Sequence, residues 1–412
     1  MTSIWTLIGL LGLAFLGSAL LGPRGAARFG LASGVEYVLA GIALGPVALG
    51  VLEKGTLATF DPVGGVAVGW LSLLIGLGFG YEGRRRVPAR SQAFGIGLAA
   101  VTGAAIAGAL IALFRATHAF APADRVLIAG GVGAACAGTT RHLARWMSGR
   151  YGARGPVHRL FAEMADADDA VAIVATAVLF ALHPVGGDAV RLSPWAWGGL
   201  SLGLGFVLGF TATMLLGRDF RLDASWGTLL GTGLLGIGLS QQLGLSPLTT
   251  MFAMGATISL TSGHRHEIVE MTRPTERAVL LPALLLAGAK IDFAVPLLVA
   301  SVATGFGARA VSKLAGGLLI RSAIGPRVPR WIGLGLMPTG GLSIGVALSF
   351  ALRFPGRIGD TVLAITAGLM IVGEMIGPPA FRAALAAIGE IREGAPMPSS
   401  SSLTPPPPEA AP

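Results

Sequence analysis

The feature that most constrains the fold of this chain is a series of long apolar segments separated by short, arginine-rich loops. Hydrophobic residues make up 53% of the 412 residues and charged residues only 12%, about half the charged fraction of a soluble domain. Runs of about 20 apolar residues can cross a bilayer as helices, and backbone in lipid must satisfy its own hydrogen bonds. The sequence therefore predicts an all-α polytopic membrane protein embedded in the lipid bilayer.

We count thirteen apolar runs and expect each to form one transmembrane helix. Three of them are short or merge with a neighbour, which leaves twelve or fourteen spans open. In chain order the runs cover about residues 4–21, 35–52, 64–81, 92–114, 126–143, 160–182, 195–216, 226–243, 246–261, 277–290, 295–320, 331–352 and 360–385.

The loops predict an orientation. With the N-terminus outside, the inner loops and the tail hold 21 of the 30 Lys and Arg residues, an asymmetry typical of cytoplasmic loops. We therefore expect a multi-pass protein of the inner (plasma) membrane with a cytoplasmic C-terminus. Because the arginines fall in short loops, the net charge of +9 does not indicate nucleic acid. No dinucleotide-binding fingerprint is present, so we expect no nucleotide-binding regulatory domain in this chain, and residues 389–412 predict a disordered tail.

Two runs are interrupted by residues that disfavour a continuous helix. The run 126–143 contains the glycine-rich stretch 130–140, and the run 331–352 contains Pro and Gly residues at 337–341. Backbone groups freed by such breaks must face protein or a water-filled cavity. The breaks lie at corresponding places in the two halves and cross in opposite senses, so they predict a transporter's binding site. Tight helix packing is the alternative explanation.

The run 160–182 carries four carboxylates, Glu163, Asp166, Asp168 and Asp169, in a segment that is otherwise apolar. A charge at the centre of a membrane helix costs roughly 2.5–3.5 kcal/mol on insertion scales, so these residues indicate function. Asp168 and Asp169 lie about 12–14 Å deep at 1.5 Å per residue, near the midplane. Glu163 and Asp166 lie nearer the cytoplasm, where we expect either an acidic funnel or solvated side chains.

The run 295–320 carries two cations. Lys313 lies about seven residues from the inner end, so its depth matches that of the aspartates within a turn, and Arg309 lies one turn deeper. A buried cation needs a carboxylate partner. We therefore predict a pair between Lys313 and one aspartate beside the second aspartate. The alternative is a fixed Asp168–Lys313 pair that only holds two helices together.

Asp168 and Asp169 are the candidate ligands of a transported ion. Carboxylates and backbone carbonyls supply the oxygen atoms that a hard cation such as Na⁺ requires. A carboxylate that binds either a proton or the cation, and faces one side of the membrane at a time, is sufficient for exchange. No His, Cys or Glu grouping has metal-enzyme spacing, so we expect neither an enzyme nor a cofactor, only transported Na⁺ or K⁺ and H⁺.

Four stretches together resemble the monovalent cation:proton antiporter superfamily, in particular its Kef/Nap-type branch with a sodium/hydrogen exchanger-like membrane domain. They are VEYVLAGIALGP at 35–46, ADDAVAIV at 167–174, LSPLTTMFAMG at 245–255, and SKLAG at 312–316 followed by GLGLMPTG at 333–340. The likeness extends over about residues 5–388.

This resemblance implies a fold of two inverted repeats, with two broken helices crossing in a core domain beside a dimerisation domain. It also implies elevator-like alternating access and a homodimer. We expect repeat one at about 1–183, a linker helix at about 195–216 and repeat two at about 226–388, which together form a transmembrane antiporter domain at 1–388.

The resemblance further implies roles for single residues. Asp169 corresponds to the essential ion-binding carboxylate and Asp168 to its neighbour. Lys313 corresponds to the basic residue paired with them, and Arg309 takes this place under a shifted alignment. The remaining expected site residues are Thr139 for the ion and, for the broken-helix backbone, Ala137, Gly138, Pro338, Thr339 and Gly340.

The chain departs from the family pattern at both breaks. Thr339-Gly340-Gly341 stands where the family often has Arg-Gly-Glu, and Ala137 and Gly138 replace small polar residues. We expect a secondary-active Na⁺ or K⁺/H⁺ antiporter, and two aspartates with a lysine favour Na⁺ and electrogenic exchange. One alternative is an organic-anion symporter of the same architecture, since positive helix ends bind anions. The other is a membrane sensor or channel-like protein that has lost transport.

Overall fold

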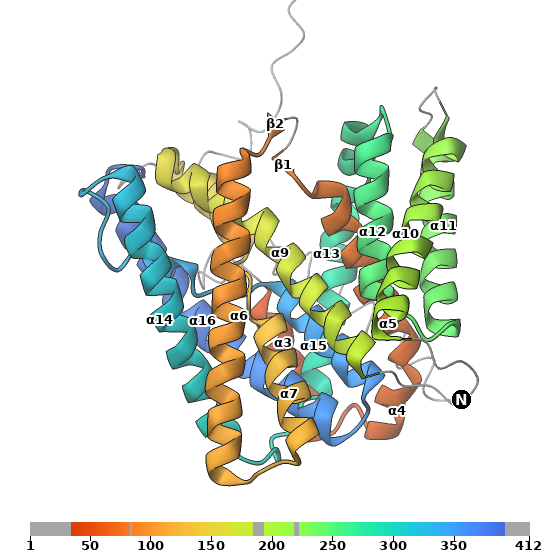
Figure 1. Ribbon diagram of the computed structural model, residues 1–412, viewed down its shortest axis with the longest axis horizontal. Coiled ribbons are helices and arrows are strands. Elements are labelled where there is room, and N and C mark those ends of the chain that lie inside the picture. Colours follow the sequence, from red (N-terminus) through yellow and green to blue (C-terminus); the bar gives the residue numbers. More distant parts are fainter. Residues whose placement is uncertain (1–33, 83–84, 184–192, 218–221, 392–412) are drawn as a thin grey trace, which may run out of the picture.

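The computed structural model describes residues 34–82, 85–183, 193–217 and 222–391. These residues form α-helices, one short 3₁₀ helix and one small hairpin, in which β1 (Tyr81–Glu82) pairs antiparallel with β2 (Arg85–Arg86). The face of the molecule that carries β1 and β2 is called the hairpin face below (Figure 1). The predicted run 4–21 and residues 392–412 of the predicted tail lie outside the described residues.

The other twelve predicted runs each correspond to a helix or a pair of helices. The first half contains α3 (Val35–Leu44), α5 (Asp61–Gly78), α6 (Ala89–Thr117), the pair α7 (Pro122–Ala135) and α8 (Arg141–Tyr151), and α9 (Pro156–Leu182). After α10 (Pro194–Leu216), the second half contains α11 (Leu222–Gln242), α12 (Pro247–Thr261), α13 (Arg265–Ala289), α14 (Leu298–Ile324), the pair η1 (Ile332–Leu336) and α15 (Gly341–Arg353), and α16 (Arg357–Ala387). A further helix, α4 (Lys54–Thr59), is too short to span a bilayer.

Two predicted boundaries were wrong. The run 35–52 is helical only to Leu44, because the ring of Pro46 cannot continue the helix. Conversely, α13 begins at Arg265 rather than near 277. The first half of α13 carries charged residues such as Arg273 and Glu276, so a prediction from apolar runs places the start of the helix too late.

Four described helices are long and apolar enough to cross a membrane by length and composition alone: Asp61–Gly78, Ala89–Thr117, Pro194–Leu216 and Arg357–Ala387. Others are short, broken, or carry buried charges, as α9 and α14 do. Large apolar side chains nevertheless lie exposed along α10 and α11, among them Trp195, Phe206 and Leu235. An apolar outer surface of this kind is what a bilayer covers.

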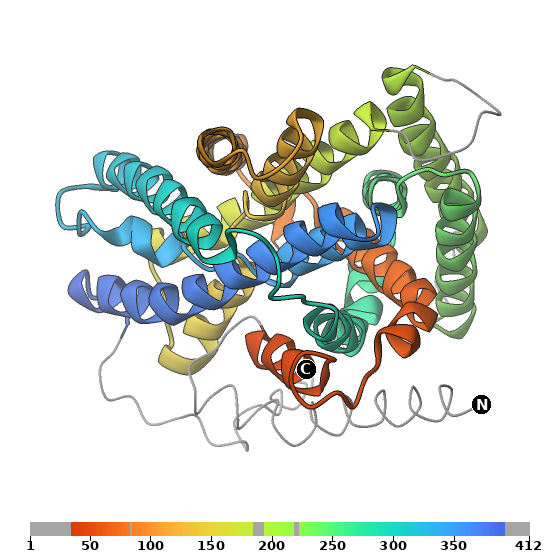
Figure 2. The ribbon, with the colours of Figure 1, turned by 90° about the horizontal axis from the view of Figure 1, so that it is seen from below.

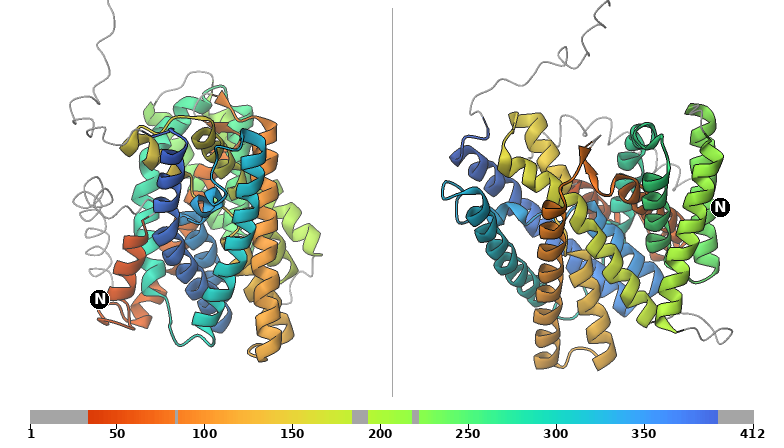
Figure 3. Two further views of the ribbon diagram at one scale, coloured as in Figure 1. Left: turned by 90° about the vertical axis from the view of Figure 1, so that its left-hand side faces the viewer. Right: turned by 45° about the horizontal axis from the view of Figure 1, so that its top comes forward.

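The two halves of the chain pack in matching pairs, as expected for inverted repeats. α5 packs along α12, and α13 packs along α3. α6 contacts α7 and α9, just as α14 contacts η1 and α16, and α6 and α14 contact each other (Figure 2). The broken helices run in opposite senses: α7 approaches the centre from the face opposite the hairpin, and η1 approaches it from the hairpin face (Figure 3).

Glycine allows the close approach in both long helix pairs. A Cβ at Gly76 of α5 would collide with the backbone of α12, and one at Gly255 of α12 would collide with the backbone of α5. Gly41 and Gly288 stand in the same relation between α3 and α13. Small residues that bring backbones together are a common way to join helices in lipid, where apolar burial gives no driving force. The two halves therefore repeat the same packing device.

Candidate functional site

The two predicted breaks meet at the centre of the molecule. The first occupies 136–140, between α7 and α8, and the second occupies 337–340, between η1 and α15. The Thr140 N–H donates to the Pro338 carbonyl at 3.2 Å, which joins the breaks where they cross. Gly340 has a φ of +83°, and a Cβ there would lie 2.8 Å from Thr140 Oγ1. The crossing therefore needs glycine at this position.

Arg309 of α14 binds the carbonyl ends of both broken helices. Its side chain is 1% exposed and donates to five backbone carbonyls, those of Cys136, Gly138, Leu336, Met337 and Pro338. The last carbonyls of a helix have no partner within it and carry partial negative charge. A guanidinium, with five N–H donors, is suited to satisfying several of them together. Arg309 thus fastens the two breaks to each other and to α14.

Asp168 and Asp169 lie midway along α9, buried against the first break. Their residues are 2% and 8% exposed, and Oδ2 of Asp168 accepts the Thr139 N–H at 2.7 Å. A Cβ built at Gly138 would lie 3.2 Å from Oδ1 of Asp168 and 3.6 Å from Oδ1 of Asp169, so both carboxylates face this glycine. Among the described residues, Oδ1 of Asp168 is buried without a hydrogen-bond partner. A buried carboxylate oxygen without a donor is a free ligand position.

Lys313, one turn from Arg309 on α14, reaches the same break from the other side. Its residue is fully buried, and its ammonium donates to Thr139 Oγ1 at 2.9 Å and to the Ala137 carbonyl at 3.3 Å. In the described part of the chain no ion pair joins Lys313 directly to Asp168. Thr139 stands between them, because its hydroxyl accepts from the lysine and its amide donates to the aspartate.

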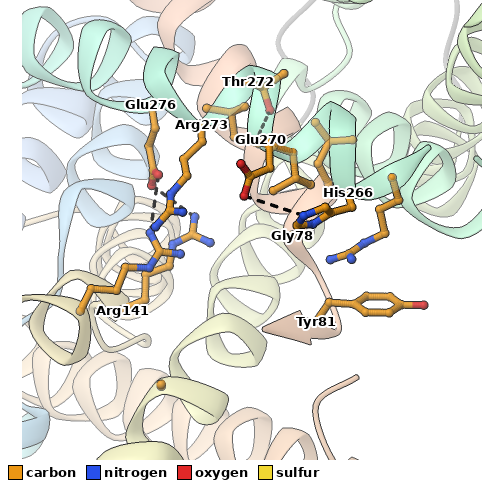
Figure 4. Close-up of a pocket in the computed structure, with 14 residues that line it drawn as sticks. Gly78, Tyr81, Arg141, His266, Glu270, Thr272, Arg273 and Glu276 are labelled. Atoms are coloured by element: carbon orange, nitrogen blue, oxygen red, sulfur yellow. Dashed lines mark hydrogen bonds and ion pairs between the residues drawn. The ribbon is translucent and has the colours of Figure 1, made fainter. Parts of the chain in front are cut away.

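Two cavities that share lining residues lie on the hairpin-face side of the aspartates. The smaller, of about 30 Å³, is called the Asp169 cavity and is lined by Asp169, Thr140, Thr339, Arg141 and Glu276 among others. The larger, of about 300 Å³, is called the hairpin-face cavity and shares Arg141 and Glu276 with the first (Figure 4). A third cavity of about 340 Å³ opens near Asp61, on the opposite face. Neither aspartate is among the described residues that line it.

Glu163 and Asp166 were predicted to form an acidic funnel or to be solvated side chains near the cytoplasm. Glu163 is 5% exposed, and its Oε2 accepts a hydrogen bond of 2.6 Å from the Ser91 hydroxyl on α6. Its carboxylate therefore contacts the neighbouring helix α6. The placement of the Asp166 side chain lies outside what the structure describes.

The predicted start of the tail, Gly389, is ordered together with the next two residues. The Glu390 carboxylate accepts the backbone N–H groups of Val157 and His158 at 2.9 and 2.8 Å. A carboxylate is stabilising at the positive end of a helix. Glu390 therefore caps the N-terminus of α9, the helix that carries the aspartates.

Two residues that line the Asp169 cavity, Thr140 and Glu276, were not among the predicted site residues. Thr140 accepts the His142 N–H and so caps α8, besides contacting the second break. Glu276 lies within 3.5 Å of nitrogen atoms of Arg141 and His142. The sequence signal that could have indicated Glu276 is its position as the acidic residue between Arg273 and Arg277, directly before a predicted span.

Two broken helices that cross at the centre of a membrane protein are a common feature of secondary transporters. The profile of the family described as "Sodium/hydrogen exchanger, transmembrane" matches residues 13–385, and the chain belongs to this family. It is therefore a membrane transporter of the cation/proton exchange class, not an enzyme.

Comparison with solved structures shows the same fold. The sodium proton antiporter MjNhaP1 from Methanocaldococcus jannaschii, in its structure at pH 8, superposes with a TM-score of 0.69 over 94% of this chain and 100% of that chain, at 17% sequence identity. A structure of the same antiporter from an electron-microscopy map superposes with a TM-score of 0.65, covering 94% and 99% at 17% identity. A search of curated protein sequences finds no significant match.

Proposed function

We propose that the chain exchanges a monovalent cation for protons at Asp169 and Asp168. The observation that carries this proposal is the unpartnered Oδ1 of Asp168, buried beside Asp169 where the broken helices cross. A desolvated carboxylate pair is costly unless a proton or a cation compensates its charge. The two species compete for the same oxygen atoms, which couples their movements in opposite directions.

Thr140 and Thr339 offer additional oxygen atoms beside Asp169, because both line its small cavity. Oγ1 of Thr339 is buried without a hydrogen-bond partner among the described residues. A hard cation released from water needs several oxygen ligands. Carboxylate and hydroxyl oxygens that line one small cavity are ligands of this kind.

The hairpin face is the cytoplasmic face in this proposal. It carries arginines of the β1–β2 hairpin, of the α8–α9 connection and of the α14–η1 connection, as cytoplasmic loops do. The Asp169 cavity then lies on the cytoplasmic side of the aspartates, as expected for an inward-facing state. The C-terminus lies inside and the N-terminus outside.

The test is cation-driven proton movement in proteoliposomes that contain the purified protein. The parent protein should move protons when Na⁺ or K⁺ is added. Asp169→Asn should abolish this response, because an amide side chain neither takes up and releases a proton nor carries the negative charge that binds a cation. Asp292→Asn, at an exposed pair with Lys54, serves as the control and should retain transport. Unchanged flux in Asp169→Asn would remove the proposal.

Na⁺ is the proposed cation, and the exchange is proposed to be electrogenic, because Lys313 can balance one carboxylate while the other binds the ion. Flux should then be larger with Na⁺ than with K⁺, and it should respond to an imposed membrane potential. Equal rates with both cations would contradict the first point, and indifference to potential would contradict the second.

We propose that the assembly is a homodimer, and that residues 1–388 divide into repeats at about 1–183 and 226–388 joined by the helix near 195–216. Native mass spectrometry after mild detergent extraction tests the dimer, and a monomer alone would count against it. Separate expression of the two repeats, followed by a test of their association, addresses the division.

A further inference from the structure

Glu276 stands in the wall between the hairpin-face cavity and the Asp169 cavity, since it lines both. Its Oε1 lies 3.5 Å from nitrogen atoms of Arg141 and His142, and its Oε2 lies 3.8 Å from Nη1 of Arg145. The side chains of Glu276, Arg141 and His142 are 16%, 14% and 19% exposed. Glu276, Arg141, His142 and Arg145 are called the Glu276 cluster. Figure 4 shows the ion pair between Glu276 and Arg141 among the residues that line the hairpin-face cavity.

The Glu276 cluster joins two different groups of helices. Its basic members lie on α8, which continues from the first break and is tied through that break to Arg309 and Lys313 of α14. Glu276 lies on α13, which packs along α3 and also against α5. The cluster therefore connects α8, which packs against the aspartate helix α9, with α13, which carries neither a break nor an aspartate of the pair.

We propose that Glu276 is a positioning residue for transport, and that its cluster stabilises the state in which Asp169 communicates with the hairpin face. This inference rests on the proposed function. In this proposal the cluster acts by holding α8 in place, not as a ligand of the ion. The ion pairs of the cluster are expected to form in this state only. Exposing Asp169 to the opposite face requires α8 and α13, which lie on either side of these ion pairs, to move relative to each other.

The expected consequence is a shift between two states. A contact changes a conformational equilibrium only by the difference in its strength between the states. Partly buried pairs that share one carboxylate are screened less by salt than exposed pairs. Removing the Glu276 charge should therefore weaken the state open to the hairpin face and leave the chemistry at Asp169 intact.

The experiment measures the apparent KM for Na⁺ from each side of proteoliposomes with known orientation. Glu276→Gln should raise the KM on the hairpin-face side and lower it on the opposite side, each by roughly threefold or more. Glu276→Asp keeps the charge and should restore the parent values in part. Glu270→Gln is the matched control: it removes a carboxylate from the same helix and the same hairpin-face cavity, but its partner is His266 of α13 itself.

Hydrogen exchange of the α8 amides gives a second readout that does not depend on transport. It should rise in Glu276→Gln and stay at the parent level in Glu270→Gln. If Glu276→Gln does not fold, Arg145→Gln removes only the most exposed cation of the cluster, at 45%, and should shift both KM values in the same directions by less. Equal changes of KM on both sides, or unchanged α8 exchange, would overturn the inference. Absence of any Na⁺-driven flux in the parent protein would instead count against the proposed function.

Discussion

Lys313 and Asp168 are joined through a single residue, Thr139, which binds the lysine with its hydroxyl at 2.9 Å and the aspartate with its backbone N–H at 2.7 Å. The two opposite charges are thereby held apart although both are buried at the first break. This separation leaves one oxygen of Asp168 without a donor. In a direct lysine–aspartate pair, the ammonium would compete for that oxygen.

Thr139→Val should weaken cation binding by about tenfold. The substitution keeps the shape and the backbone N–H but removes the hydroxyl that accepts from Lys313, a hydrogen bond to a charged group worth about 1.5–3 kcal/mol. The freed ammonium then turns to the vacant oxygen of Asp168 and competes with the cation. The apparent KM for Na⁺ in proteoliposomes measures the effect. Thr139→Ser retains the hydroxyl and should stay near the parent value, and equal KM values for Val and Ser would contradict the relay.

Arg309→Gln should destabilise the folded protein severely, by at least about 3 kcal/mol, as expected when one partner of a buried charged network is removed. Several carbonyls at the helix breaks lose their donor, and each such loss costs about 1–3 kcal/mol. Thermal unfolding in detergent checks this. Arg357→Gln is the control, because Arg357 is exposed and donates to the single Ala119 carbonyl. Similar melting temperatures for the two variants would show that Arg309 does not fasten the breaks.

Gly340→Ala should prevent correct crossing of the breaks. The new Cβ would meet Thr140 at 2.8 Å in a backbone conformation with φ +83° that side chains rarely adopt. Gly345→Ala, five residues later in α15, meets nothing within 4 Å and should be neutral or stabilising by up to about 1 kcal/mol, because alanine favours helix. The yield of monodisperse protein and its melting temperature measure both. A stable Gly340→Ala protein would show that the second break tolerates a side chain.

The sequence predicted that the buried charges of two helices meet at the breaks, because charges in lipid are costly and therefore need partners. Depth along two helices brought Lys313 within a turn of Asp168 and Asp169, with Arg309 one turn deeper. The structure places all four at the crossing of the breaks. The fold class followed from apolar runs and from the two interrupted spans. The family match and the superposed antiporter structures confirm that fold.

The partners of these residues could not be predicted. Arg309 binds backbone carbonyls, and a carbonyl is present at every residue, so no sequence pattern marks it as an acceptor. Lys313 reaches Asp168 only through Thr139, a geometry set by where the first break ends. Glu276 was missed because the charged first turns of α13 read as a loop, although they continue the helix.

Substitution of Glu163 tests whether a carboxylate of α9 outside the Asp168–Asp169 pair is needed for transport. It accepts a hydrogen bond from Ser91 and is 5% exposed, so it is expected to hold α9 against α6. Glu163→Gln keeps an oxygen that accepts from Ser91 and should change the free energy of unfolding by no more than about 1 kcal/mol, the usual net worth of one hydrogen bond. Na⁺-driven flux should stay within about twofold of the parent rate, a change of about 0.4 kcal/mol in the barrier.

The contrast with Asp169→Asn then separates the two acidic positions on one helix, since both substitutions remove a single negative charge. Ser91→Ala leaves the Glu163 oxygen without its donor and should lower the melting temperature more than Glu163→Gln does. A tenfold loss of flux in Glu163→Gln, with an unchanged melting temperature, would restore this carboxylate to the ion pathway and contradict its role in helix packing.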